Sequence, residues 1–125
     1  MEKSMQKNEQ SEKMESTPAV APYMDIYEST DEIVMVADLP GVPQENLELK
    51  FENNEISIKA IPVSADKSWK PRFREIGQFR YERAFKLPSG LDISKIKADF
   101  DHGVLKVVMP KSESEKPHTI KINRR

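Results

Sequence analysis

Three side chains capable of acid and base chemistry lie within four positions of this sequence. They are Asp99, Asp101 and His102, in the stretch ADFDHGVLKVVMPK. A carboxylate beside an imidazole suits general base catalysis, but only within an enclosed pocket that holds a further reacting group. The other histidine, His118, lies in a polar stretch near the end. Because His and Gly both tolerate positive φ, His102 and Gly103 predict an exposed hairpin turn, with no catalytic or metal site.

Composition limits the remaining chemistry. A chain of 125 residues without cysteine favours one domain and excludes disulfides and thiolate catalysis. The net charge of −1, with 33% charged residues, argues against a general nucleic-acid or membrane binder. No apolar run approaches the roughly 18 residues of a membrane helix, and no signal peptide is visible. We therefore expect a soluble cytoplasmic protein with no cofactor.

The chain divides into three parts. Residues 1–22 have no aromatic side chain and no sustained period, which predicts a flexible arm. Residues 23–110 carry the apolar pattern of one small domain. Residues 111–125 form a tail whose first part, 111–119, is a polar linker.

The middle part alternates apolar and polar residues with a period of two. Leu47, Leu49 and Phe51 alternate with charged residues, and Asn53-Asn54 then predicts a hairpin turn. In a later strand, Ile96, Ala98 and Phe100 are expected to face inward. Six or more short strands and no long helical period predict an all-β protein, an antiparallel β-sandwich.

A basic and aromatic segment spans residues 69–86. Such interleaving is typical of platforms that bind single-stranded nucleic acid. However, Phe79, Tyr81 and Phe85 have strand spacing, which favours core positions, and basic residues also protect exposed sheet edges. We therefore expect no nucleic acid partner. The connection over residues 62–76 is too long for a tight hairpin, which favours a functional loop or a short strand of its own.

Arg83 shares the apolar face of Tyr81 and Phe85 by alternation, whereas Arg80 shares the polar face with Glu82. A buried guanidinium needs a partner, either at an interface or among backbone carbonyls. Alternatively, the long side chain could extend out to water.

The tail ends in a second apolar pattern, Ile120-Lys121-Ile122. Two β-branched residues at i and i+2 present one apolar face in an extended strand. The pair could fold back onto its own domain, or it could dock into a groove of another chain by strand addition.

Four motifs together resemble the small heat shock proteins, the alpha-crystallin family. They are Ala37–Val42 (ADLPGV), Arg83–Pro88 (RAFKLP), Ala98–Leu105 (ADFDHGVL) and Ile120–Ile122 (IKI). Each motif is weak alone, but all four occur in the order and at the spacing of the family. The resemblance covers about residues 23–122 and places Arg83 at the signature arginine of the family.

The resemblance implies an immunoglobulin-like sandwich, the alpha-crystallin domain, and an ATP-independent holdase for non-native client proteins. It implies a dimer in which a strand from the long loop pairs with the partner, and larger homo-oligomers. The residues that the resemblance places at the dimer interface are Phe73, Arg74, Glu75, Ile76 and Arg83. Ile120 and Ile122 are implied to dock between edge strands of a neighbouring dimer, in a groove containing Leu47, Leu49, Ile96 and Ala98.

The sequence departs from the family pattern in three places. His102 occupies the position of the usual Asn, and Phe79 replaces a glycine near the signature arginine. The arm also lacks the phenylalanines that usually bind clients, which leaves Met1, Met5 and Met14 as the client-binding candidates. Because the arm lacks these phenylalanines, an alternative function is that of a co-chaperone or adaptor, which recognises a folded partner.

Overall fold

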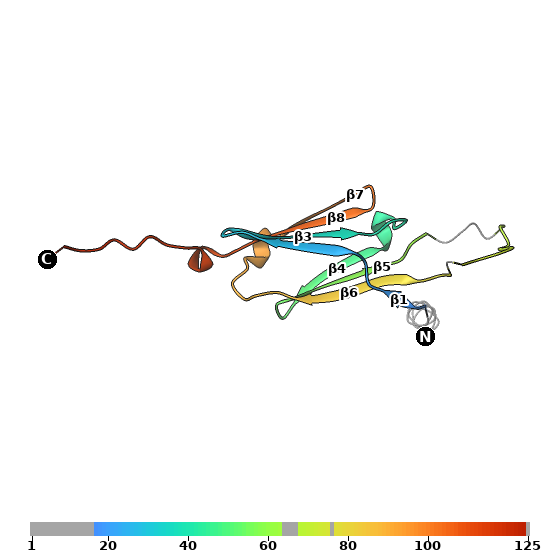
Figure 1. Ribbon diagram of the computed structural model, residues 1–125, viewed down its shortest axis with the longest axis horizontal. Coiled ribbons are helices and arrows are strands. Elements are labelled where there is room, and N and C mark those ends of the chain that lie inside the picture. Colours follow the sequence, from blue (N-terminus) through green and yellow to red (C-terminus); the bar gives the residue numbers. More distant parts are fainter. Residues whose placement is uncertain (1–16, 64–67, 76, 125) are drawn as a thin grey trace, which may run out of the picture.

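The protein is a sandwich of two sheets. A computed structural model describes residues 17–63, 68–75 and 77–124, which form two four-stranded sheets with three short 3-10 turns (Figure 1). Sheet A has the strand order β1-β6-β5-β4, and sheet B has the order β2-β3-β8-β7. All neighbouring strands are antiparallel except β1 and β6, which are parallel. The prediction of an all-β, immunoglobulin-like antiparallel sandwich is confirmed.

The strands are short, as their patterns predicted. Sheet A consists of β1 (Ala19–Val20), β6 (Arg80–Lys86), β5 (Glu55–Ala60) and β4 (Leu47–Glu52). Sheet B consists of β2 (Met24–Glu28), β3 (Glu32–Asp38), β8 (Val104–Pro110) and β7 (Lys97–Asp101). The 3-10 turns are η1 (Gln44–Asn46), η2 (Ile93–Lys95) and η3 (Glu113–Glu115).

The core lies between the inward faces of the two sheets. Alternate residues of β3, β5 and β8 are buried, and their neighbours in sequence are more exposed, because successive strand side chains point to opposite faces. Burying one such aliphatic side chain stabilises the fold by about 1.5–3 kcal/mol. The buried set is Ile33, Met35, Ala37, Leu39, Val42, Ile56, Ile58, Ala60, Tyr81, Leu87, Leu105, Val107 and Met109.

Two hairpins use turns in which both central residues have positive φ. Asn53 and Asn54, with φ of 52° and 58°, connect β4 to β5. His102 and Gly103, with φ of 50° and 77°, connect β7 to β8. Positive φ at both positions matches the right-handed twist of the flanking strands.

The sandwich begins earlier in the chain than composition suggested. Ala19 and Val20 pair with Arg80 and Tyr81 as β1, although they lie within the segment predicted as a flexible arm. Pro22 is buried. A strand of two residues has too short a pattern to be recognised in sequence, and its pairing partner lies 61 positions away.

The two long sides of the sandwich differ. Only residues 21–23 separate β1 from β2, so these edge strands of sheets A and B must lie on the same side. We call this side the closed edge. The opposite edge strands, β4 and β7, therefore lie together on the other side, which we call the open edge.

Candidate functional site

The acidic and histidine cluster lies on the outer surface. His102 Nδ1 is 2.9 Å from Asp101 Oδ1, and these side chains are 91% and 84% exposed. Asp99 is also exposed on β7. Among the described residues, no group of three or more His, Cys, Asp or Glu side chains is arranged to hold a metal ion. The cluster therefore shapes the β7–β8 turn and lacks the enclosure that acid–base chemistry needs.

The open edge carries the residues expected to form a docking groove. Leu47 and Leu49 on β4 are partly buried, with their neighbours Glu48 and Lys50 exposed. Ile96 immediately precedes β7 and packs against the core while remaining partly exposed. These side chains touch the core from one side only, so the open edge presents apolar surface between the two sheets.

Ala98 differs from its sequence-based expectation of a core position. Its partner on β8, Val107, is fully buried, so Ala98 points toward the same inner face. Ala98 is nevertheless exposed, because β7 is the last strand of sheet B and no further strand in the described part of the chain covers it. Phe51 and Phe100 are likewise only partly buried at this edge, although alternation alone placed them in the core.

The tail isoleucines make no contact with the sandwich that would shield them. Ile120 and Ile122 are 84% and 89% exposed. Figure 1 shows the tail as an extended segment that points away from the two sheets. The pair therefore presents its apolar face to solvent in the single chain.

The described residues of the long connection between β5 and β6 form no strand. Phe73 is 84% exposed, and Arg74 and Glu75 are exposed beside it. Ile76, the fourth residue of the expected partner-pairing strand, lies outside the described residues. The client-binding candidates Met1, Met5 and Met14 also lie outside the described residues.

Arg83 lies on the inward face of β6 and has a partner within its own chain. Its Nη1 donates to the backbone carbonyl oxygen of Pro22 at 3.2 Å, and its guanidinium carbon lies 5.0 Å from the centre of the Phe85 ring. Of the three sequence-based possibilities, which were an interface, backbone carbonyls and extension to water, the structure shows the contact with a backbone carbonyl. The contact ties β6 to the segment that joins β1 to β2.

Arg80 holds the start of the same closed edge from the outer face. Its Nε donates to Glu82 Oε2 at 2.8 Å, and its Nη1 donates to the carbonyl oxygen of Thr17. The Arg80 hydrogen bond holds the pKa of Glu82 below its usual value, and the positive charges of Arg80 and Lys59 act in the same direction. Sequence alternation placed Arg80 on the polar face but missed its contact with Thr17, since no local pattern links residues so far apart.

The aromatic side chains of the basic segment do not form a stacking platform. Tyr81 is buried, and Phe79 meets it edge to face with ring centres 5.0 Å apart. Phe85 packs against the core. Base stacking requires exposed ring faces along a strand, and only Trp69 and Phe73, in the loop, are highly exposed here.

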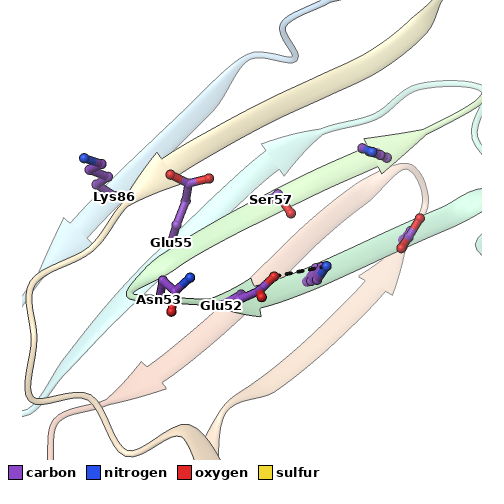
Figure 2. Close-up of a pocket in the computed structure, with 8 residues that line it drawn as sticks. Glu52, Asn53, Glu55, Ser57 and Lys86 are labelled. Carbon is purple, nitrogen blue, oxygen red and sulfur yellow. Dashed lines mark ion pairs between the residues drawn. The ribbon is translucent and has the colours of Figure 1, made fainter. Parts of the chain in front are cut away.

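The outer face of sheet A has a different character from the open edge. It holds a hollow of about 460 Å³. An ion pair between Lys50 Nζ and Glu52 Oε2, 3.1 Å apart, crosses part of its surface (Figure 2). The lining residues are Glu48, Lys50, Glu52, Asn53, Glu55, Ser57, Lys59 and Lys86. A wall of balanced charges lacks the apolar surface that would hold an isoleucine pair.

Known proteins share both this sequence pattern and this fold. The model of the Hsp20/alpha crystallin family matches residues 25–123. A probable 15 kDa heat shock protein of Leptospira interrogans is 32% identical over 110 residues, covering 88% of this chain and 82% of the relative. An 18 kDa heat shock protein of Clostridium acetobutylicum is 36% identical over 106 residues, covering 80% of this chain and 68% of the relative.

Solved structures agree with the sequence relatives. The crystal structure of a small heat-shock protein from Xylella fastidiosa superposes with a TM-score of 0.66 and 29% identity, covering 84% of this chain and 98% of that chain. Among the described residues there is no helix with the length and apolar character needed to span a bilayer. The chain belongs to the Hsp20/alpha crystallin family, whose members are ATP-independent chaperones and not enzymes.

Proposed function

We propose that the protein is a holdase, which binds non-native client proteins without ATP and prevents their aggregation. Membership of the Hsp20/alpha crystallin family supports a chaperone role. The observation that carries the proposal is that the same chain has both an exposed apolar tail and an open apolar edge. Ile120 and Ile122 present apolar surface to solvent, and Leu47 and Leu49 line an edge that no other strand of the sandwich covers.

In this proposal the tail of one copy docks at the open edge of another. Ile120 and Ile122 would enter the groove between β4 and β7. The walls of this groove are Leu47 and Leu49 on β4, Ile96 just before β7, and Ala98 on β7. One such contact is weak and reversible, whereas several contacts in a closed assembly reinforce one another through effective concentration. Release of a tail would uncover the groove for an apolar client segment.

The building block of the assembly would be a dimer formed through the long loop. Phe73, Arg74, Glu75 and Ile76 would pair with an edge strand of the partner, and the exposure of Phe73 is consistent with this role. Arg83 would support the dimer indirectly, because it fixes the segment that leads into β2. We place the protein in the cytoplasm, acting on clients without a cofactor, nucleic acid or membrane.

Suppression of client aggregation tests this function. Light scattering of a heat-aggregating client should fall as the protein is added in increasing ratio. Replacing both Ile120 and Ile122 with Ala should change how strongly the protein suppresses aggregation at a given ratio to the client. The neighbouring Thr119→Ala substitution should leave this suppression unchanged. No suppression at any ratio would remove the holdase proposal and favour an adaptor that binds folded partners, which a pull-down of folded proteins would then examine.

A further inference from the structure

The outer faces of the two sheets differ in character, although both point away from the core. On sheet A, Glu48 lies opposite Lys59 and Glu55 lies opposite Lys86, so acidic and basic side chains face one another. Ala84 is the only apolar residue that β4, β5 and β6 place on this face. The outer face of sheet A is therefore polar, and its charges are balanced across neighbouring strands.

The outer face of sheet B has an apolar centre. On β3, Val34 and Val36 alternate with buried residues and so point away from the core. Val34 lies opposite Tyr27 on β2 and opposite Val108 on β8. Tyr27 is 59% exposed, and the three valines are only partly buried. These four residues, which we call the valine cluster, present apolar surface to solvent.

Carboxylates surround the valine cluster. The strands of sheet B place two cations on the same face, Lys97 and Lys106, and Lys106 lies opposite Asp99. With five carboxylates and two ammonium groups the face has a net charge of −3, whereas the whole chain has a net charge of −1. The five carboxylates belong to Asp25, Glu32, Asp38, Asp99 and Asp101.

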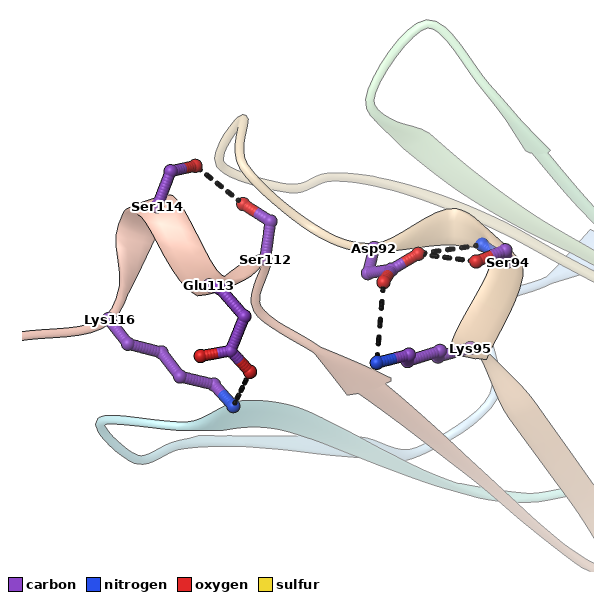
Figure 3. Close-up of polar contacts among 7 residues, drawn as sticks. All are labelled: Asp92, Ser94, Lys95, Ser112, Glu113, Ser114 and Lys116. Atoms are coloured by element: carbon purple, nitrogen blue, oxygen red, sulfur yellow. Dashed lines mark hydrogen bonds and ion pairs between the residues drawn. The ribbon is translucent and has the colours of Figure 1, made fainter.

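Most of these carboxylates lack an ion-pair partner. Beside sheet B the chain does pair its charges, since Lys116 Nζ lies 3.1 Å from Glu113 Oε1 after β8 (Figure 3). Lys95 Nζ likewise lies 3.9 Å from Asp92 Oδ2 before β7 (Figure 3). Within the part of the chain that the structure describes, no ion pair forms at four carboxylates of the outer face, those of Asp25, Glu32, Asp38 and Asp99. These four groups are therefore available to an added cation.

The outer side chains of β3 form a short linear pattern. Every second residue of the strand points outward, and in order these are Glu32, Val34, Val36 and Asp38. The pattern is acid, valine, valine, acid, and its ends lie about 20 Å apart at strand spacing. An extended segment that reads Lys-x-Val-x-Val-x-Lys presents complementary side chains at the same spacing, because alternate residues of a strand share one face.

Charge decides which partner fits this face. A net negative surface repels nucleic acid and anionic membranes. A second copy related by a two-fold axis would bring the same negative face against it. An apolar segment flanked by lysine or arginine instead covers the valine cluster and places its cations beside the unpaired carboxylates.

We propose that the outer face of sheet B is a binding surface for extended apolar segments of non-native proteins that are flanked by lysine or arginine. This surface is separate from the groove at the open edge. For its role the inference rests on the proposed holdase function, and it adds the chemical class of segment that the protein prefers. The binding itself can be measured without an aggregating client.

Fluorescence anisotropy with a labelled peptide tests the surface in the full chain. The probe is Lys-Ser-Val-Ser-Val-Ser-Lys, which has the seven-residue length of β3. One comparison peptide carries Glu in place of both lysines, and another carries Ser in place of both valines. We expect the probe to bind more tightly than either comparison peptide. In about 1 M salt, where the screening length falls to about 3 Å, binding of the probe should weaken.

Two pairs of substitutions remove the two parts of the pattern. Glu32→Gln with Asp38→Asn removes its charge, and Val34→Thr with Val36→Thr removes apolar surface while keeping β-branched side chains. Each pair should weaken binding of the probe by about fivefold or more, because exposed ion pairs and apolar contacts each contribute to the affinity.

The outer face of sheet A supplies the matched control. Glu48→Gln with Glu55→Gln removes the same amount of charge from the opposite face of the sandwich, so binding of the probe should stay unchanged. Equal binding by the parent and by both sheet B variants, with circular dichroism showing intact strands, would overturn the proposal. Equal binding of the glutamate peptide, or no binding of the probe to the full chain, would overturn it without any variant.

The outcomes also separate this surface from the proposed function. If the probe binds as expected and client aggregation is not suppressed, the surface stands and the holdase proposal fails. If aggregation is suppressed and the probe does not bind, the holdase proposal stands and this surface is not the site of binding.

Discussion

The closed edge and the open edge are built from equivalent strands of the same two sheets, yet only one of them is sealed. At the closed edge the chain itself passes from β1 to β2, and Arg83 binds the carbonyl oxygen of Pro22 in that crossing at 3.2 Å. At the open edge β4 and β7 each continue into a hairpin within their own sheet, so the chain does not cross between them. The difference shows that connectivity, and not composition alone, decides which apolar edge of a sandwich stays available.

Exposure at the open edge has a direct energetic consequence. Leu47, Leu49 and Ile96 already touch the core, so a second apolar group placed beside them would bury surface without reorganising the fold. At the closed edge, by contrast, an added group would have to displace Arg83 and its hydrogen bond. We therefore expect substitutions at the closed edge to change stability and substitutions at the open edge to change assembly.

The largest effect is expected from the tail that would fill the open edge. Burying two isoleucines gains about 3–6 kcal/mol before the cost of ordering the tail. Ile120→Ala combined with Ile122→Ala should therefore reduce larger oligomers to dimers, with unchanged circular dichroism. Sedimentation velocity measures the change. If the parent protein is already a dimer, or the variant keeps its full size, the isoleucines do not join copies.

The closed edge should respond to Arg83→Ala in its stability. Removing a charged hydrogen-bond donor from Pro22 costs about 1.5–3 kcal/mol, whereas Lys106→Ala, an exposed position on β8, should stay within about 0.5 kcal/mol. Arg80→Ala should also destabilise the fold, since Arg80 holds Thr17 and is only 20% exposed. Urea unfolding compares the three. An Arg83→Ala protein as stable as Lys106→Ala would contradict the sealing role of Arg83.

A substitution within the groove wall should separate stability from docking. Ala98→Arg adds a long side chain at an exposed position, so unfolding should change little. Docking should weaken by about 1–3 kcal/mol, the usual cost of forcing extra volume into a packed contact. Native mass measurement at several protein concentrations would report the loss of larger assemblies. Unaltered assembly at every concentration would place the docking site elsewhere.

The smallest effect concerns pH at the closed edge. The hydrogen bond from Arg80 lowers the pKa of Glu82 in the folded state. A lowered folded pKa stabilises the fold at pH above the unfolded value of 4.5, and this contribution disappears as pH falls through the lowered pKa. Glu82→Gln should therefore lose a small part of its stability at neutral pH and show less acid sensitivity below pH 4.5. If the parent protein and the Glu82→Gln variant lose stability along the same curve as the pH falls, Glu82 makes no such contribution to stability.

Sequence predicted the local features well because local physics determines them. Alternation in β4 predicted which of its faces packs against the core, and the Asn53-Asn54 and His102-Gly103 pairs predicted turns that require positive φ. The inward direction of Ala98 also follows from alternation. Its exposure does not, because that depends on β7 being the last strand of its sheet.

Features that depend on distant pairing were not visible in the sequence. β1 is two residues long, and its partner in β6 follows by 61 positions. The hydrogen bonds from the Ser112 N–H to Gly90 and from the Lys111 N–H to Asp31 likewise join backbone atoms, which leave no trace in the side-chain pattern. Arg83 was ambiguous for the same reason, since its partner is the carbonyl oxygen of Pro22.

The most direct test of the open edge as the docking site is amide hydrogen exchange with an isolated tail. The protein carrying both isoleucine-to-alanine changes would be mixed with a peptide of residues 117–124, and with the same peptide containing Ala at both isoleucine positions. We predict that the native peptide slows exchange in β4 and β7 and leaves β1 and β2 unchanged, while the alanine peptide has no effect. Slowed exchange at β1 or β2, or none at either edge at saturating peptide, would contradict the assignment of the open edge as the site where copies join.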